Sequence, residues 1–263
     1  MTEREELEAL RAENARLRQY IKEGEGFLRN IIEPYLTGEV LETILEPYLS
    51  GELLETDFEN KDGIKIGGER RTVSILFSDL RDSTRMAEEM EPADFITMLN
   101  HFFSEMIEIV NAWQGNILDF VGDAIVAVFG APRVNTCSAR DAAACAVAMQ
   151  RRMEAVNQWN REQGYPEISM GIGMHIGDAI LGNIGSHTRM KYDMIGRNVN
   201  LASRIQTYTN GGQILVSTEF LEAAGDRIIE NEAGFRWVKP KGIQSEILVH
   251  DIIGYGTQRI RGQ

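Results

Sequence analysis

From residue 67 onward, short apolar runs alternate with longer stretches in which apolar residues recur every three to four positions. The short runs are rich in Val, Ile, Phe and Met and predict strands at 72–79, 116–121, 124–129 and 168–176. The longer stretches, 92–113 and 137–159, predict amphipathic helices. Their apolar faces comprise Phe95, Met98, Leu99, Phe102, Met106 and Ile109 in the first helix, and Ala139, Ala142, Ala146, Met149 and Met153 in the second.

The order strand, helix, hairpin, helix, strand is typical of a ferredoxin-like βαββαβ core. We therefore expect an α/β (α+β) fold, with Gly122 and Asp123 in the hairpin turn. The remaining pattern predicts C-terminal additions to this core. They are a helix at 197–208, a strand at 213–217, a helix at 218–224 and a strand pair at 235–240 and 245–252.

The N-terminal segment 1–27 has a different pattern, with apolar residues spaced alternately by three and four. Leu7, Leu10, Asn14, Leu17 and Ile21 take the positions a, d, a, d and a of a heptad. One Asn at an a position favours a parallel two-stranded coiled coil. The alternative is a single amphipathic helix with a solvated charged face.

Residues 28–66 contain an internal repeat. The sequence at 33–43, which begins Glu33-Pro-Tyr-Leu, returns with small changes at 46–56. Pro34 and Pro47 suit the first turns of short helices. The pattern thus divides the chain into 1–27, 28–66, a main domain at 67–254 and a tail at 255–263.

Charge and composition exclude several classes of function. The chain of 263 residues has 27 basic and 40 acidic side chains and a formal charge of -13, which disfavours nucleic acid and anionic lipid as partners. An RNA-binding sheet would also need paired aromatic residues on a strand and a basic surface. We find no signal peptide and no membrane-spanning run, and we expect a cytoplasmic protein. Cys137 and Cys145 are expected to be buried thiols and not a disulfide.

Two carboxylates at the ends of apolar strands are the main candidates for chemistry. Asp79 ends the run 72–79, and Asp123 lies in the predicted hairpin turn. Burying a carboxylate is costly unless a cation or hydrogen bonds compensate. Two carboxylates on adjacent strands would form an oxygen-lined site for hard divalent cations. Alternatively, both are turn residues that face water.

Several motifs, in order, resemble the class III nucleotidyl cyclases, the adenylyl and guanylyl cyclase family. They are Phe77-Ser-Asp-Leu-Arg-Asp-Ser-Thr84, Phe120-Val-Gly-Asp-Ala-Ile125, Gly182-Asn-Ile-Gly185, Asn198-Val-Asn-Leu-Ala-Ser-Arg204 and Val238-Lys-Pro-Lys-Gly242. The resemblance extends from about Arg70 to Gly254. It implies cyclisation of a nucleoside triphosphate, in which the ribose 3′-oxygen attacks the α-phosphate and pyrophosphate leaves.

The resemblance also implies roles for individual residues. Asp79 and Asp123, with the Leu80 carbonyl, would bind two magnesium or manganese ions. Asn200 would orient the ribose, and Arg204 would stabilise charge on the α-phosphate. Lys239 would hold the β- and γ-phosphates. From the sequence alone, Asn200 and Arg204 also fit a capped helix start with a solvated Arg.

By the same resemblance, each active site lies between two chains, with the aspartates from one and Asn and Arg from the other. The active form would be a head-to-tail homodimer that the N-terminal coil holds together. Residues 28–66 would couple a sensor, which an upstream domain could supply, to the catalytic domain. The alternative for 28–66 is a passive spacer.

The base-contacting positions depart from the pattern of the family. Asp119 replaces the Lys typical of adenylyl cyclases, whereas Asp193 suits the adenylyl type. Guanylyl cyclases have an acidic residue, typically Glu, at the first position. We expect ATP as substrate and keep GTP as an alternative, with Lys191 as a neighbour able to compensate. A third alternative is a catalytically silent nucleotide-binding dimer. We expect His175 to pack in the core and to bind no cofactor.

Overall fold

The computed structural model describes residues 67–186, 189–232, 234–241 and 245–260, which belong to one structural unit. The predicted coiled coil at 1–27 and coupling element at 28–66 lie outside the described residues.

A mixed sheet forms the centre of this unit, with the strand order β10-β9-β6-β4-β1-β3-β2. β5 pairs with β4, and β7 and β8 pair with β9. The strands are β1 (Gly67–Leu80), β2 (Asn116–Val121), β3 (Ala124–Phe129), β4 (Met170–Ser186), β5 (Arg189–Ile195), β6 (Ile214–Ser217), β7 (Ile228–Glu230), β8 (Arg236–Val238), β9 (Ile247–Tyr255) and β10 (Gln258–Arg259). The helices are α4 (Ser83–Glu89), α5 (Pro92–Ala112), α6 (Ser138–Gln163), α7 (Arg197–Thr207) and α8 (Thr218–Ala224).

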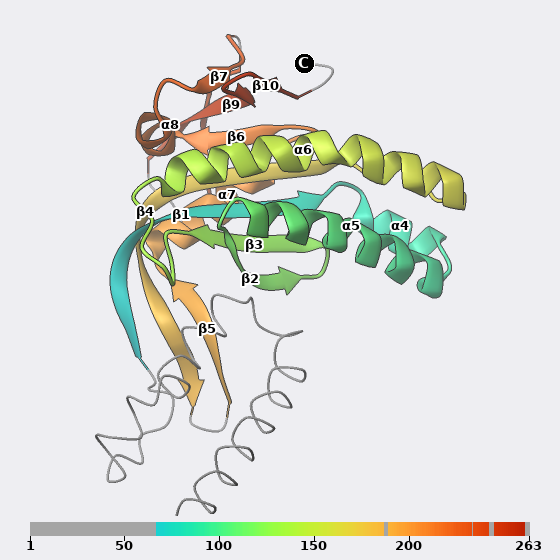
Figure 1. Cartoon of the computed structure of the whole chain (residues 1–263), viewed down its shortest axis with the longest axis horizontal. Helices are drawn as coiled ribbons and strands as arrows, with labels where there is room; N and C mark the ends of the chain where they lie inside the picture. The colour runs from blue at the N-terminus through green and yellow to red at the C-terminus, as the bar shows by residue number, and fades with distance from the viewer. Residues whose placement is uncertain (1–66, 187–188, 233, 242–244, 261–263) are drawn as a thin grey trace, which may run out of the picture. The chain divides into compact units, whose positions relative to one another are not determined.

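Helices cover both faces of the sheet. α5 and α6 pack side by side on one face, and α7 packs against β1 and β4 on the other (Figure 1). The alternation of β1 explains the two layers. Leu76 and Leu80 join the core under α5 and α6, whereas Val73 and Ile75 join a second core that includes Ala202 of α7.

Glycines in β4 let α7 approach the sheet closely. A Cβ atom added to Gly173 would lie 2.2 Å from the backbone nitrogen of Gln206 in α7. The same contact would be impossible for any other residue type without moving the helix. This close approach positions α7 relative to the end of β1.

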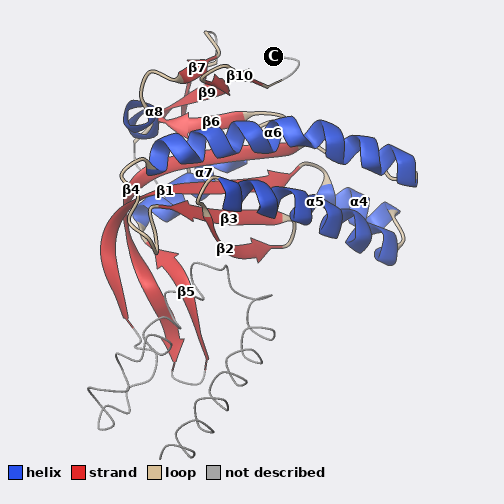
Figure 2. Ribbon diagram, viewed as in Figure 1, coloured by secondary structure: helices blue, strands red, loops and turns tan. Residues whose placement is uncertain are grey.

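The pattern predicted most of the core correctly. The hairpin 116–121 and 124–129 is confirmed, and β1, α5, β2, β3, α6 and β4 follow one another in the expected order. The strand expected at 168–176 is too short, because β4 continues to Ser186 and pairs with β5, which the sequence did not reveal. Gly177, Gly182 and Gly185 interrupt the apolar pattern there. Together with the first half of β1, β4 and β5 form an arm that extends beyond the helices (Figure 2).

The two cysteines behave differently. Both are free, as expected, and Cys145 is buried in α6. The expectation that Cys137 is buried is wrong, because it precedes the first turn of α6 and is exposed.

In the described part of the chain, we find no helix that is both long and apolar enough to cross a membrane.

Candidate active site

The ends of β1 and of the β2–β3 hairpin bring Asp79 and Asp123 together. Asp123 follows Gly122, whose φ of +66° is one that glycine adopts without strain. The backbone N–H of Leu80 donates to Oδ2 of Asp123 at 3.1 Å, which ties the turn to the end of β1. The Leu80 carbonyl remains a predicted cation ligand.

The two carboxylates destabilise each other's charge. Burial, a hydrogen bond with Asp123 and repulsion from Asp123 together raise the pKa of Asp79 from 3.8 to about 6. Arg81 and Gln206 lower it, but they do not cancel the rise. The negative charge of the pair is therefore only partly balanced, and a bound cation would stabilise the ionised form of Asp79.

This donor set fits hard divalent cations. Two carboxylates and a neighbouring carbonyl offer only oxygen, which Mg²⁺ and Mn²⁺ prefer. Within the described ranges, no group of three or more His, Cys, Asp or Glu side chains is arranged to hold a metal ion. Any cation bound here would therefore take its other ligands from water or substrate, as catalytic Mg²⁺ commonly does.

Arg81 and Gln206 are contacts that sequence reasoning missed. Nη2 of Arg81 lies 3.3 Å from Oδ2 of Asp79 and 3.2 Å from its carbonyl oxygen. Gln206 of α7 lies close enough to lower the pKa of the same carboxylate, and its side-chain amide donates to the Gly171 carbonyl at 3.5 Å. The position of Arg81, two residues after Asp79, was the only signal in the sequence, whereas Gln206 depends on how α7 packs.

α7 carries Asn200 and Arg204 on the side away from these aspartates. Gln206, two residues after Arg204, faces Asp79 and is buried, and residues two apart on a helix point in nearly opposite directions. Asn200 is exposed. Within the described residues, no hydrogen bond or ion pair joins Asn200 or Arg204 to Asp79 or Asp123. One chain thus keeps the two sets of predicted catalytic residues apart.

Lys239 lies just after β8, next to the end of α7. The hydroxyl of Tyr208 donates to the Lys239 carbonyl at 2.8 Å, and the Arg236 guanidinium donates to the Tyr208 carbonyl. The Lys239 side chain is exposed. Tyr208, which the sequence analysis did not single out, therefore fixes the Lys239 backbone relative to α7.

The predicted base-contacting residues Asp119 and Asp193 lie together with Lys191. Nζ of Lys191 is 2.6 Å from Oδ2 of Asp119 and 3.5 Å from Oδ2 of Asp193. β2 supplies Asp119, and β5 supplies the other two. The structure thus brings Asp119 and Asp193, 74 positions apart in the chain, together around Lys191. From the sequence, Lys191 was expected only as a neighbour able to compensate for the missing Lys.

His175 is buried in β4, as expected, and it also links two helices. Its Nδ1 lies 2.7 Å from Oγ of Ser217, the N-cap of α8, and its Nε2 lies 3.3 Å from Oδ1 of Asn198 in α7. A neutral imidazole satisfies both contacts, since one nitrogen donates and the other accepts. Burial accordingly lowers its pKa below the usual 6.5.

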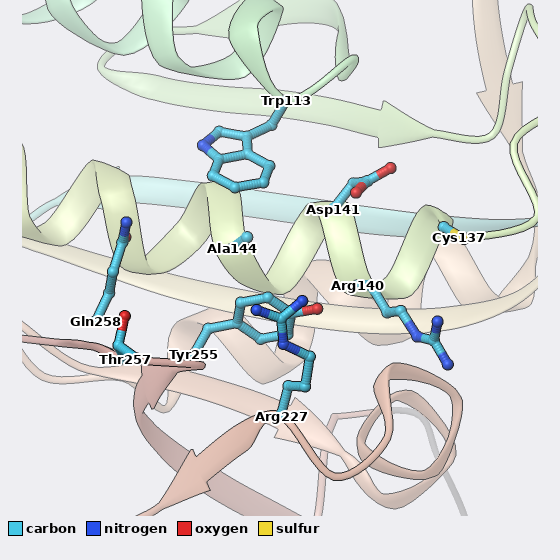
Figure 3. A pocket seen from close by; sticks show the side chains of 9 residues that line it. All are labelled: Trp113, Cys137, Arg140, Asp141, Ala144, Arg227, Tyr255, Thr257 and Gln258. Carbon is cyan, nitrogen blue, oxygen red and sulfur yellow. The ribbon is translucent and has the colours of Figure 1, made fainter.

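A half-open pocket lies away from these residues. A pocket of about 340 Å³ lies beside α6 and β9, where Arg227 stacks over Tyr255 at 5.2 Å from the ring centre and Trp113 faces them from across α6 (Figure 3). It contains none of the predicted site residues.

A family model and two solved structures that match this chain all represent nucleotidyl cyclases. The family model of the adenylate and guanylate cyclase catalytic domain matches residues 68–243. The crystal structure of the guanylyl cyclase Cya2 is 41% identical, with a TM-score of 0.72, and the match covers 74% of this chain and 100% of that one. The adenylyl cyclase CyaB from P. aeruginosa is 31% identical, with a TM-score of 0.69, and the match covers 73% of this chain and 99% of that one.

Curated protein sequences are also similar to this chain, but the match covers only part of each relative. Adenylate cyclase 1 of Rhizobium meliloti (strain 1021) is 32% identical over 187 residues, which are 70% of this chain and 28% of the relative. An uncharacterized protein of Mycobacterium tuberculosis is 33% identical over 197 residues, 74% of this chain and 35% of the relative. The chain thus matches about a third of the length of these relatives.

Proposed function

The chain belongs to the class III adenylyl and guanylyl cyclase catalytic domains, and from this premise we propose that it converts ATP to cyclic AMP and pyrophosphate as a head-to-tail homodimer. The ribose 3′-oxygen forms a bond to the α-phosphorus, while the bond from that phosphorus to the oxygen of the β-phosphate breaks.

The observation that carries this proposal is the crowded carboxylate pair. Asp79 and Asp123 meet at the end of β1, and burial together with the neighbouring Asp123 carboxylate raises the pKa of Asp79 to about 6. Such a pair is suited to binding positive charge. Two divalent cations bound there would lower the pKa of the attacking hydroxyl and neutralise the triphosphate.

The other residues position the substrate. Asn200 orients the ribose, and Arg204 stabilises the negative charge that develops on the α-phosphate. Lys239 holds the β- and γ-phosphates, with its backbone fixed by Tyr208. Asp193 accepts a hydrogen bond from the base.

The geometry of α7 supports a dimer. Gln206 lies on the side of α7 near Asp79 of its own chain, whereas Asn200 is exposed and Arg204 is half-buried on another side of the helix, where a second chain could reach them. Two copies related by a twofold axis would exchange these residues reciprocally and create two equivalent sites. We retain the parallel coil at 1–27 and the coupling element at 28–66 as predictions that explain how a signal reaches this dimer.

GTP is the alternative substrate, and a specific observation favours it. Asp119 has the acceptor chemistry that suits guanine, and the guanylyl cyclase Cya2 is 41% identical. A catalytically silent nucleotide-binding dimer is the remaining alternative, although Asp79, Asp123, Asn200 and Arg204 are all present.

The test is turnover of ATP and GTP, assayed separately with Mn²⁺ and then Mg²⁺, with the products separated by chromatography. We expect cyclic AMP from the full chain as a dimer. Cyclic GMP in its place would support the alternative substrate. A dimer that forms neither product would contradict catalysis and favour the silent module.

A further inference from the structure

A lysine held between two carboxylates lies on the β2 and β5 side of the sheet. Lys191 contacts Asp119 at 2.6 Å and Asp193 at 3.5 Å. All three side chains remain accessible, with exposed fractions of 41%, 46% and 39% respectively. The cluster is therefore an accessible polar surface and not a buried structural ion pair.

A β-bulge creates this arrangement. In the pairing of β2 with β3, Ile117 lies opposite Ala127, but Asp119 lies opposite Val126, so Leu118 is the extra residue. Without the bulge, Asp119 would share the face of Ile117, which packs toward α5. With it, Asp119 lies on the opposite face, with Val126, and meets Lys191.

The strand β5 presents the other two residues. Lys191 and Asp193 are two positions apart and project from the same side of the strand. Tyr192 and Met194 point the other way and pack in the core. The core contacts of β5 therefore fix the direction of the two charged side chains.

The hydrogen bonds among Asp119, Lys191 and Asp193 do not use every polar atom of these side chains. Oδ1 of Asp119 accepts from the N–H of Phe120, and Oδ1 of Asp193 accepts from the N–H of Met194. Oδ2 of Asp119 accepts from Lys191, whereas Oδ2 of Asp193 accepts no hydrogen bond from any described residue. Since an ammonium has three donors, Lys191 retains N–H groups beside the Asp193 Oδ2 atom, which it contacts only as an ion pair at 3.5 Å.

We propose that Lys191 determines the base specificity of the enzyme: it donates to N1 of adenine while Asp193 accepts from the 6-amino group. Asp119 then positions Lys191 and does not contact the base. This inference rests on the proposed cyclase function and names the purine that its site selects.

The acceptors that remain in the cluster favour adenine over guanine. Adenine presents a donor next to an acceptor, and one carboxylate oxygen beside an ammonium complements that pair. Guanine presents one acceptor followed by two donors, which a single carboxylate receives when both its oxygens are available. Here Oδ1 of Asp119 and Oδ1 of Asp193 each accept a backbone N–H already, so neither aspartate offers both oxygens.

The experiment compares ATP with 1-deaza-ATP, in which a C–H group replaces N1, for the wild type and Lys191→Met. The wild type should convert ATP with a kcat/KM about 10- to 100-fold higher, because one charged hydrogen bond is lost with the analogue. Lys191→Met should lose a similar factor on ATP and convert both substrates about equally. Arg70→Met, which removes an exposed cation from the same arm, should keep the wild-type ratio.

A second variant guards against misfolding of the first. Lys191→Arg keeps a cationic donor at position 191 against Asp119 and should recover much of the ATP activity and the discrimination that Lys191→Met loses. Equal discrimination in the wild type and Lys191→Met would overturn the role of Lys191 alone. A wild-type preference for GTP over ATP would overturn the choice of adenine. No product from either nucleotide would overturn the proposed function itself.

Discussion

The chain contains two pairs of neighbouring aspartates, and they differ in what lies between them. Asp79 and Asp123 face each other with Arg81 on one side only, and the pKa of Asp79 rises to about 6. Asp119 and Asp193 are bridged by Lys191, which contacts both. In the first pair a cation contacts only one of the two carboxylates, whereas in the second pair one cation contacts both.

The difference shows how one residue type serves two purposes. A carboxylate pair without a bridging cation is suited to binding metal ions and the phosphates that accompany them. A pair already neutralised by a lysine has little attraction for a cation, and it offers hydrogen bonds to an uncharged group such as a purine edge.

The largest effect should come from breaking the first pair. If the pair holds the cations as proposed, Asp79→Asn and, separately, Asp123→Asn should lower the rate of cyclic product formation by about 10³-fold, because each removes one carboxylate charge from the cation site. Initial rates at saturating ATP and Mn²⁺ would measure it. Asp82→Asn is the matched control, since Asp82 is exposed and Asn tolerates its φ of 60°. A loss below tenfold would show that the pair is not the cation site.

Mixing two inactive variants should show whether the aspartates and Asn200 of one active site come from different chains. We expect Asp79→Asn and Asn200→Ala to be nearly inactive alone. Co-expressed in equal amounts, they should recover about one quarter of wild-type activity. Half of the dimers would then be mixed, and each would have one intact site of two. Co-expressed Asp79→Asn and Asp123→Asn serve as the control and should recover nothing, because both changes affect the same half of each site. Recovery there would contradict the head-to-tail arrangement.

A smaller effect should follow from loosening Lys239. Tyr208→Phe removes one hydrogen bond to the Lys239 carbonyl and should raise the KM for ATP by about 3- to 10-fold with little change in kcat. Steady-state kinetics would measure both constants. Tyr165→Phe removes a comparable hydrogen bond, to Asp94, far from the site, and it should leave KM unchanged. An equal rise in both variants would indicate a general loss of rigidity.

The smallest effect concerns the pH dependence of stability. Burial lowers the pKa of His175 below 6.5, so the folded protein binds its proton less readily than the unfolded chain. The stability due to neutral His175 is therefore complete above about pH 6.5 and is lost as the pH falls below it. Between pH 7.5 and 5, the Tm of the wild type should drop further than that of His175→Gln. Glu219 and Arg197, the charged neighbours, are present in both proteins. Parallel curves would show that His175 keeps its ordinary pKa.

Local pattern was sufficient for much of the fold. The period of two in the strands and of three to four in the helices depends on neighbouring residues alone, so the hairpin 116–121 and 124–129 and the helices α5, α6, α7 and α8 could be predicted. The same holds for Asp79 and Asp123, because a carboxylate after an apolar strand is conspicuous in the sequence. The family motifs then gave their expected partners Asn200, Arg204 and Lys239.

Three features depended on contacts between distant segments. β5 was missed because it is stabilised by pairing with β4, in a stretch where glycines hide the apolar period. The contact of Gln206 with Asp79 depends on how closely α7 packs on Gly173. The exposure of Cys137 depends on where α6 begins.

The sequence by itself thus determined the order of the core elements, the family and the metal-binding candidates, because each is encoded in a local run of residues. The tertiary structure alone decided where Asp119 points. The bulge at Leu118 arises from the register between β2 and β3, and it places Asp119 on the face of Val126, where Lys191 of β5 reaches it. No periodicity in one strand reveals the register of two, because register is set by the pairing itself.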